Sequence, residues 1–347
     1  MTIVETTPLV VGGIDTHGQL HVAAALDEVG GLLGSESFAA DPPGYAALLA
    51  WLESFGTVTK VGVEGTGSYG AGIARHLTRA GIVVVEIDRQ NRQSRRNAGK
   101  SDPLDAVEAA RANLSGKASG RAKSRDGWVE ALRVLLVAKR SARSGRVKAL
   151  TQMRQLTYSA PDQLQARLKG LSISEFVSVA AGLRPTRAPD VMTAATKASL
   201  SVLAHRVADF EAEIAELDAM ITPILEAHAP DLLGLNGLGI DTAASLLVAA
   251  GDNPERLRSE AAWAHLCGVS PLEASSGKVT RHRLNRGGDR QANRALWHIV
   301  ITRLASDPDA QAYMERRLKE GRSKREVVRI LKMACSGDPL HRLRRPA

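Results

Sequence analysis

Four carboxylates occupy positions from which they could share a metal ion. Asp15 and Glu64 each end an apolar run, and Asp102 and Asp105 open a helical segment on one face of that helix. If the strands that end at Asp15 and Glu64 are neighbours, all four acids meet at one sheet edge. Carboxylate oxygens are the hard ligands that Mg²⁺ prefers, and two such ions about 4 Å apart serve phosphoryl transfer. Singly, Asp15 also fits a turn and Asp102 a helix N-cap, whereas the set of four favours a metal site.

A short loop with two serines is the second group of residues that could carry out chemistry. Ser275 and Ser276 precede Gly277 and stand among cationic side chains. A hydroxyl between phosphate-binding guanidinium groups is suited to attack a phosphodiester, although a Ser-Gly pair also commonly forms a plain turn. The neighbouring cations are Lys278, Arg281, Arg283, Arg286 and Arg290.

A glycine-rich turn offers a different interpretation. Residues 65–70 spell a literal GxGxxG that follows a predicted strand and opens a helix, and Glu86 lies in the next strand. This is the dinucleotide-binding fingerprint in its required context, so an NAD-dependent oxidoreductase is an alternative. Against it, the turn follows a β-meander, and the carboxylate of Glu64 would face the pyrophosphate.

Apolar patterning predicts the elements that must position these groups. Residues 9–38 form a predicted three-stranded antiparallel meander, after which helices and strands alternate. An antiparallel meander followed by alternating helices and strands predicts an α/β domain with a mixed sheet and helices on both faces. The later elements are a helix at 42–54, a strand at 59–64, a helix to 80, a strand at 82–87, an arginine-rich loop at 88–100 and a helix at 102–114.

The rest of the chain is predicted to be mainly helical. Long helices are expected at 128–156 and 194–227, after a polar linker at 117–126. Apolar residues in the second helix recur in steps of four and three, which predicts an antiparallel coiled-coil arm or a dimer contact, or else an amphipathic helix packed on its own domain. These residues are Leu203, Val207, Phe210, Ile214, Leu217, Ile221 and Ile224, and Pro223 is expected to kink the helix end.

Residues 231–252 predict a helix-hairpin-helix. Two short apolar segments are joined by a turn that contains Gly237 and Gly239. These glycines would free the N–H groups at the start of the second helix to meet a phosphate, although a tight helix connection gives the same pattern.

Composition narrows the class of protein. The 347 residues suffice for two or three domains, and the net charge of +9 arises from Ser275 onward, where 18 Lys and Arg face 7 Asp and Glu. Such a basic region is typical of nucleic-acid binding, with a solubilising tail as the alternative. Aromatic residues are only 3% of the chain, which argues against an aromatic platform that stacks on the bases of single strands. Two cysteines favour a reducing cytoplasm, and we expect neither a membrane span nor a signal peptide.

Together these segments resemble the DEDD transposases, the insertion-sequence family called "one-ten". The resemblance covers most of the chain, and its specific features are the spaced acids and the Ser-Ser-Gly loop. The segments that carry it are VGGIDTHGQLHVAAA, VGVEGTGSYGAGIARHLTRAGIVVVEIDR, RQSRRNAGKSDPLDAVEAARA, LLGLNGLGIDTAASLL and CGVSPLEASSGKVTRHRLNRGGDRQANRALW.

The resemblance implies a domain plan and a set of site residues. An RNase H-like (RuvC-like) catalytic domain is expected at 1–120, a helical coiled-coil segment for oligomerisation at 121–230, a mostly α-helical domain with the serine loop at 231–335, and a basic tail at 336–347. Ser276 matches the family's nucleophile, with Ser275 as the alternative register. The acids expected to bind Mg²⁺, as two ions, are Asp15, Glu64, Asp102 and Asp105.

The implied activity is that of an insertion-sequence transposase. Such a recombinase cuts and exchanges double-stranded DNA through a phosphoserine ester, guided by a structured RNA. Homo-oligomers, dimers or tetramers, are expected, in which one protomer supplies the acids and another the serine. The alternatives are a metal-only junction-resolving nuclease, the NAD-dependent oxidoreductase, and an element protein that binds nucleic acid without cutting it.

The chain departs from the family pattern near its end. After Lys332 we expect a continuing apolar helix, but residues 336–339 read Ser-Gly-Asp-Pro and predict a break. A shortened last helix is therefore expected, and it is the only feature that favours the non-cutting alternative.

Overall fold

Two compact units make up the chain. The computed structural model describes residues 8–87, 102–116, 118, 120–254, 257, 259–275, 282–283 and 285–343. The first unit comprises 1–127 with 250–258, and the second comprises 128–249 with 259–347. Each unit has its own apolar core.

A mixed five-stranded sheet forms the centre of the first unit, as the sequence predicts. Its order is β3-β2-β1-β4-β5. β1, β2 and β3 are an antiparallel meander, and β4 and β5 run parallel to β1. The strands are β1 (Leu9–Thr16), β2 (Leu20–Leu26), β3 (Leu32–Ala39), β4 (Thr57–Glu64) and β5 (Val83–Ile87).

Helices cover both faces of this sheet. α1 (Pro42–Glu53) and α2 (Ala71–Arg79) bury apolar side chains on one face, where Ile14 and Val63 contribute to the core. α4 (Asp102–Leu114) packs on the other face through alanines. A Cβ atom on Gly62 would lie 2.8 Å from the carbonyl oxygen of Ala109, so the close approach of α4 depends on glycine in the strands.

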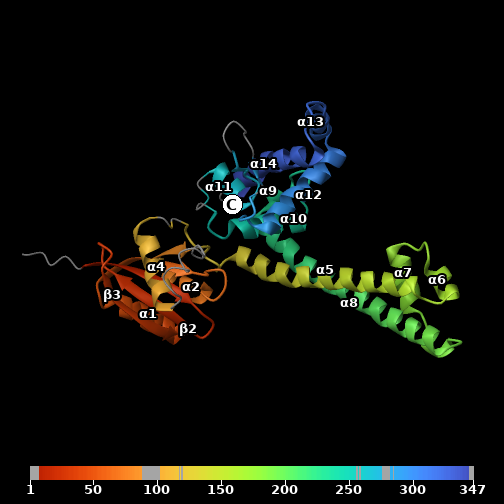
Figure 1. Cartoon of the computed structure of the whole chain (residues 1–347), viewed down its shortest axis with the longest axis horizontal. Coiled ribbons are helices and arrows are strands. Elements are labelled where there is room, and N and C mark those ends of the chain that lie inside the picture. The colour runs from red at the N-terminus through yellow and green to blue at the C-terminus, as the bar shows by residue number, and fades with distance from the viewer. Residues whose placement is uncertain are drawn as a thin grey trace, which may run out of the picture. The chain divides into compact units, whose positions relative to one another are not determined.

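Two long antiparallel helices dominate the second unit. α5 (Trp128–Tyr158) lies along α8 (Val191–His228), which continues past Pro223 (Figure 1). Arg146 pairs with Glu211 at 2.6 Å, and Val207 is buried in a core at the far end of the pair. The two predicted long helices are confirmed, whereas coiled-coil packing stays a prediction. That far end also holds α6 (Asp162–Leu168), α7 (Ile173–Ala181) and a 3₁₀ turn (Pro185–Arg187).

Shorter helices form the rest of the second unit. The same unit contains a two-stranded antiparallel sheet of β6 and β7, which the sequence did not predict. None of the helices in the described residues combines the length and apolar character that a membrane span requires. The elements are α9 (Pro230–Leu233), α10 (Ile240–Ala250), α11 (Glu260–Leu266), β6 (Leu272–Glu273), β7 (His282–Arg283), α12 (Arg290–Ser306), α13 (Pro308–Lys319) and α14 (Lys324–Leu343).

The predicted break at residues 336–339 is wrong. α14 runs through this segment to Leu343. Cys335 and Ser336 are buried, and the indole Nε1 of Trp263 donates a 3.0 Å hydrogen bond to the carbonyl oxygen of Ser336. Packing against α11 therefore holds the helix where local propensity alone would end it.

Candidate metal centre and nucleic-acid interface

The strand register brings two of the predicted acids to one sheet edge. Ile14 pairs with Val63 in the parallel ladder, so Asp15 and Glu64 are the next residues on adjacent strands. The hydroxyl of Thr16 donates a 2.8 Å hydrogen bond to the carbonyl oxygen of Glu64, which fixes the two strand ends together. Since side chains alternate along a strand, Asp15 and Glu64 belong to the face that α4 covers.

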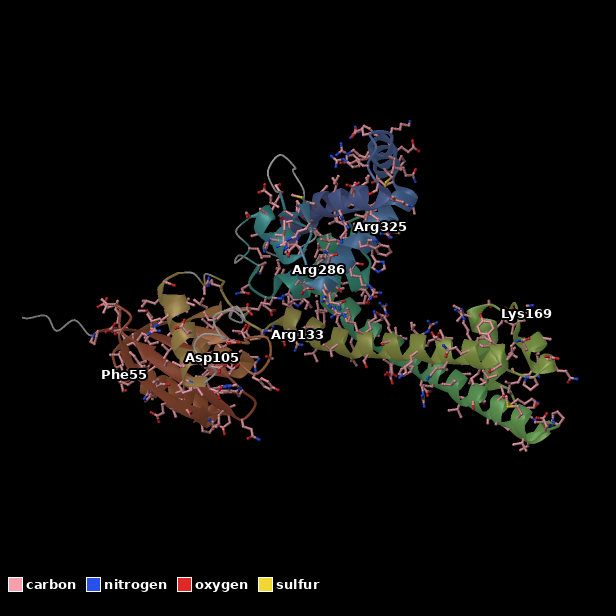
Figure 2. All side chains as sticks on the ribbon, viewed as in Figure 1. Phe55, Asp105, Arg133, Lys169, Arg286 and Arg325 are labelled. Atoms are coloured by element: carbon pink, nitrogen blue, oxygen red, sulfur yellow. The ribbon has the colours of Figure 1, made fainter. Side chains whose placement is uncertain are left out.

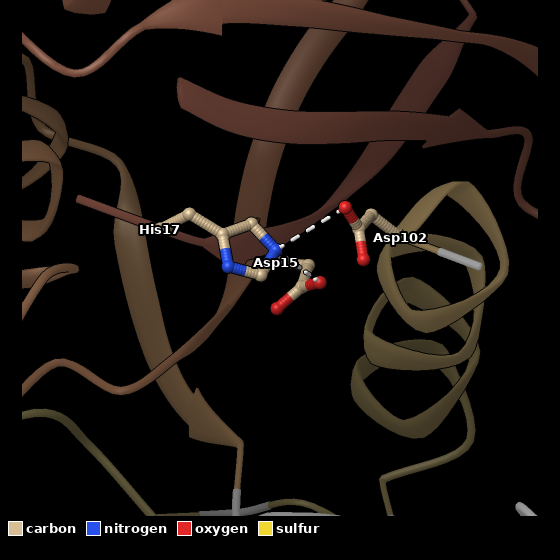
Figure 3. A group of neighbouring side chains, drawn as sticks. All are labelled: Asp15, His17 and Asp102. Atoms are coloured by element: carbon tan, nitrogen blue, oxygen red, sulfur yellow. Dashed lines mark hydrogen bonds and ion pairs between the residues drawn. The ribbon is translucent and has the colours of Figure 1, made fainter. Parts of the chain in front are cut away.

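Asp15, His17 and Asp102 form the tightest group at this edge. One potential ligand atom from each lies within 4.8 Å of the others. The imidazole Nε2 of His17 is 3.1 Å from Oδ2 of Asp15 and 3.6 Å from Oδ2 of Asp102 (Figure 3). α4 supplies Asp102 from its first turn, and β1 together with the turn after it supplies the other two.

Electrostatics distinguish Asp15 from its neighbours. Its side chain is 11% exposed, whereas that of Asp102 is 47% exposed. Burial raises the pKa of Asp15 above its ordinary value, the carboxylates of Asp105 and Asp102 raise it further, and His17 opposes these effects. The influence of Asp105 on Asp15 places this fourth acid within electrostatic range of the group.

The remaining two acids lie at the same edge but outside the tightest group. Asp105 is half-buried in the first turn of α4, where Figure 2 labels it. Glu64 is half-buried at the end of β4. The structure therefore brings together Asp15 and Asp102 directly, with Asp105 and Glu64 beside them.

His17 is a site residue that sequence reasoning missed. It stands two residues after Asp15 in the segment Asp-Thr-His-Gly, between β1 and β2. An imidazole this close to an acid at a strand end is the signal that could have identified it. Its ring nitrogen lies between two carboxylates and can orient them or hold a proton (Figure 3).

The donor set suits a hard divalent cation. Carboxylate oxygens predominate, and like charges crowd Asp15 in a partly desolvated position. A cation would relieve that repulsion, which is the usual origin of metal affinity at such clusters. Asp15 and Asp102 are the residues best placed to hold it, with Asp105 and Glu64 within the same edge.

The GxGxxG segment forms a tight turn between β4 and α2. Gly65 adopts φ of +68°, and its carbonyl oxygen accepts the backbone N–H groups of Ser68 and Gly70. Glu86, which a dinucleotide site needs for the ribose, instead accepts a 2.7 Å hydrogen bond from the hydroxyl of buried Thr66. These contacts give the glycines and Glu86 structural roles.

The central part of the serine loop lies outside the described residues. This applies to Ser276, Lys278 and Arg281. Ser275 is described and exposed. The described cations Arg283, Arg286 and Arg290 are likewise exposed.

The base of the serine loop is held firmly by the helices that carry it. Asn293 of α12 donates 3.0 Å hydrogen bonds to the carbonyl oxygens of Cys267 and Gly268. The side-chain oxygen Oδ1 of Asn293 accepts a 2.5 Å hydrogen bond from Nζ of buried Lys332 of α14. Gly268, with φ of +65°, packs against the backbone of Gly288, so both ends of the loop meet at one point.

The two glycines of the predicted helix-hairpin-helix have different surroundings. Gly237 has φ of +86°, and a Cβ atom there would lie 3.1 Å from the carbonyl oxygen of Ile299. A Cβ on Gly239 would meet nothing within 4 Å. α9 is only 4 residues long, so a full helix-hairpin-helix stays a prediction, while the start of α10 is accessible.

Two family models match the chain over separate segments. A transposase model of the DEDD class matches residues 12–158, and the "Transposase IS116/IS110/IS902 family" model matches 229–315. The first segment contains all four predicted acids, and the second contains the serine loop.

Two curated proteins are similar to part of the chain. An insertion element IS110 protein of 43.6 kDa from Streptomyces coelicolor is 33% identical over 115 residues, which are 32% of this chain and 28% of that protein. An insertion element IS900 protein of 42 kDa from Mycobacterium paratuberculosis is 28% identical over 132 residues, which are 37% and 33% of the two chains. The matched segment thus spans about a third of each relative.

Proposed function

Because the chain belongs to the IS116/IS110/IS902 family of transposases, we propose that it cuts and exchanges DNA strands at the ends of an insertion sequence. The observation that carries this proposal is the meeting of Asp15, His17 and Asp102 at one sheet edge. A mixed sheet of order β3-β2-β1-β4-β5 with acids at the ends of β1 and β4 is consistent with an RNase H-like, RuvC-like domain.

The acids would hold Mg²⁺, expected as two ions, against a DNA phosphate. When bound, Mg²⁺ would neutralise charge on the phosphate and on the oxygens that enter and leave it. Asp15 would set the position of the site, because its side chain is largely buried at the end of β1. His17 would orient the carboxylates of Asp15 and Asp102, and Asp105 and Glu64 would complete the ligand set.

Ser276 is the proposed nucleophile. Its hydroxyl would lose a proton as Oγ bonds to the phosphorus, and the bond from phosphorus to one deoxyribose oxygen would break. The leaving oxygen would take up a proton, and the other strand end would remain as a phosphoserine ester. Exposed Arg283, Arg286 and Arg290 are suited to neutralise nearby phosphates, together with Lys278 and Arg281 from the same loop.

A guide RNA and a homo-oligomer belong to the same proposal. In this arrangement one protomer supplies the acids and another supplies Ser276. The support for both is the family alone.

A covalent-adduct assay tests the chemistry. The full chain is incubated with Mg²⁺ and labelled duplex DNA that carries the element ends, and the products are resolved under denaturing conditions. We expect a protein-linked DNA species that Ser276→Ala removes and the matched control Ser275→Ala retains. An adduct that survives Ser276→Ala would remove this serine from the mechanism. Cleavage to free ends without any adduct would instead identify a metal-only nuclease.

A further inference from the structure

The second unit contains a basic pocket whose lining does not include the described residues of the serine loop. Its volume is about 820 Å³, and its walls come from the middle of α5, the start of α10 and one face of α12. This volume is within the range that holds a group the size of a sugar-phosphate unit. We call it the α5–α10–α12 pocket.

The lining charges of the pocket are predominantly positive. Four cationic side chains, Lys139, Arg140, Arg143 and Arg294, face one carboxylate, that of Asp241. Nζ of Lys139 contacts Oδ1 of Asp241 at 2.5 Å, and Arg143 pairs with the other oxygen of the same carboxylate. The single acid is therefore neutralised by its own partners and does not repel an anion.

Lys139 also fixes the geometry of the walls. Its side chain is 2% exposed and pairs with Asp218 of α8 as well as Asp241 of α10. One buried cation thus ties α5 to two other helices. Arg140 and Arg143, which follow it on α5, are held beside the first turns of α10 as a result.

Two arginines in the pocket are available to bind an anion. Neither Arg140 nor Arg294 forms an ion pair with the described part of the chain. Arg140 is half-buried, with its guanidinium donating a 3.3 Å hydrogen bond to the hydroxyl of Ser245. Burial lowers the pKa of Arg140 from its ordinary value, against the smaller opposing effects of nearby carboxylates. A partly desolvated guanidinium that forms no ion pair gains by donating hydrogen bonds to a phosphate.

The start of α10 adds backbone donors at the same place. Gly239 lines the pocket and has open space where a side chain would be, and the helix that follows it has 11 residues. The first turn of a helix presents N–H groups without helical partners, and its dipole favours an anion. Backbone donors and guanidinium groups therefore converge on one space.

We propose that the α5–α10–α12 pocket binds the sugar-phosphate backbone of duplex DNA, with Arg294 and Arg140 contacting a phosphate at the start of α10. The inference rests on the proposed function and adds a DNA contact outside the serine loop. His298 is the only aromatic ring among the lining residues, so the pocket lacks the stacking surface that unpaired bases use. Contact with the backbone makes the pocket indifferent to sequence.

A charge-matched pair of variants tests this inference in the full chain. Arg294→Gln removes an exposed cation from the pocket, and Arg154→Gln removes an exposed cation from α5 elsewhere. Affinity for a labelled duplex of mixed sequence is measured by fluorescence anisotropy across a salt titration. We expect Arg294→Gln to weaken binding about ten-fold at low salt and to lower the salt slope by about one, because one phosphate contact is lost.

Controls separate this inference from the proposed function. We expect Arg154→Gln to bind as the wild type does, Arg294→Lys to recover most of the affinity, and all variants to melt at the same temperature. Equal affinities of Arg294→Gln and Arg154→Gln, with a wild type that binds DNA, would overturn the pocket assignment alone. A loss seen only with single-stranded RNA would overturn duplex DNA as the occupant. Failure of the wild type to bind any nucleic acid would overturn both proposals.

Discussion

The raised pKa of Asp15 comes from its burial at the end of a strand rather than from its immediate sequence neighbours. β1 carries it to the sheet edge, and α4 covers it with two further acids. Burial, and to a smaller extent repulsion from these acids, raises the pKa of Asp15 and prepares the position for a cation. Asp102 faces Asp15 through His17, whereas Glu108 on the same helix is exposed and pairs with Arg111 at 2.9 Å.

A first prediction follows from this contrast within α4. Asp102→Asn should weaken Mn²⁺ or Mg²⁺ binding by at least about ten-fold, because it removes a carboxylate ligand. Glu108→Gln changes the charge equally and should leave binding unchanged. Isothermal titration calorimetry of both variants measures the difference. Equal metal affinities would show that α4 does not contribute ligands.

His21 gives the first unit a dependence on pH. Its ring is fully buried in β2 and stacks on Tyr45 with 5.6 Å between the centroids. Burial lowers the pKa of His21 below its ordinary value of 6.5. The neutral ring is thus preferred in the folded state, and the unfolded chain takes up a proton first as the pH falls below that value. The contribution of His21 to stability is complete above pH 6.5 and declines below it.

The second prediction concerns this decline. The wild type should lose up to about 1.4 kcal/mol of unfolding free energy per pH unit below 6.5, and His21→Phe should remove that dependence. His76→Phe, a half-buried histidine near the same tyrosine, serves as the control and should retain it. Urea unfolding at several pH values gives the slopes. A His21→Phe protein with the wild-type slope would contradict the account.

At the scale of elements, the sheet could be predicted because its strands obey simple patterns. β1 is a continuous apolar run, β4 ends in a buried apolar segment, and the meander shows short turns, so a mixed sheet follows, whereas the pairing of β1 with β4 was only a condition of the prediction. α14 could not be predicted in full, because the residues that sustain it are distant in sequence. The contact of Trp263 with Ser336 outweighs local preferences for a break.

The packing of α4 on the sheet gives the third prediction. Gly13 has no room for a side chain, since a Cβ atom there would overlap the backbone of Ala106 and Ala110. Gly13→Ala should lower the unfolding free energy by about 1–3 kcal/mol and displace the acids of α4, which weakens metal binding. Gly120→Ala, where a Cβ meets nothing within 4 Å, is the matched control. Urea unfolding and calorimetry measure the two effects. Normal stability and metal affinity in Gly13→Ala would contradict the packing argument.

At the scale of the whole molecule, the family and the four acids could be predicted from the sequence. Not every surface that we propose to bind DNA could be predicted in the same way. Asp15, Glu64, Asp102 and Asp105 follow from strand ends and a helix start, which are local features. A phosphate at Gly237 and Gly239 was predicted, but the arginines of the α5–α10–α12 pocket were not, because three helices far apart in sequence form it and only tertiary packing brings them together. His17 was missed because its partner on α4 is 85 positions away in the numbering.

In the proposed function, the acids at the β1–α4 edge form the centre that cuts DNA. The decisive measurement is the rate of strand cleavage in duplex DNA bearing the element ends, with Mg²⁺, for wild type, Asp15→Asn and Glu108→Gln. We predict that wild type and Glu108→Gln cleave at similar rates, that chelation of Mg²⁺ stops both, and that Asp15→Asn is slower by at least about 100-fold. Cleavage by Asp15→Asn at the wild-type rate, or undiminished wild-type cleavage after chelation, would contradict the claim.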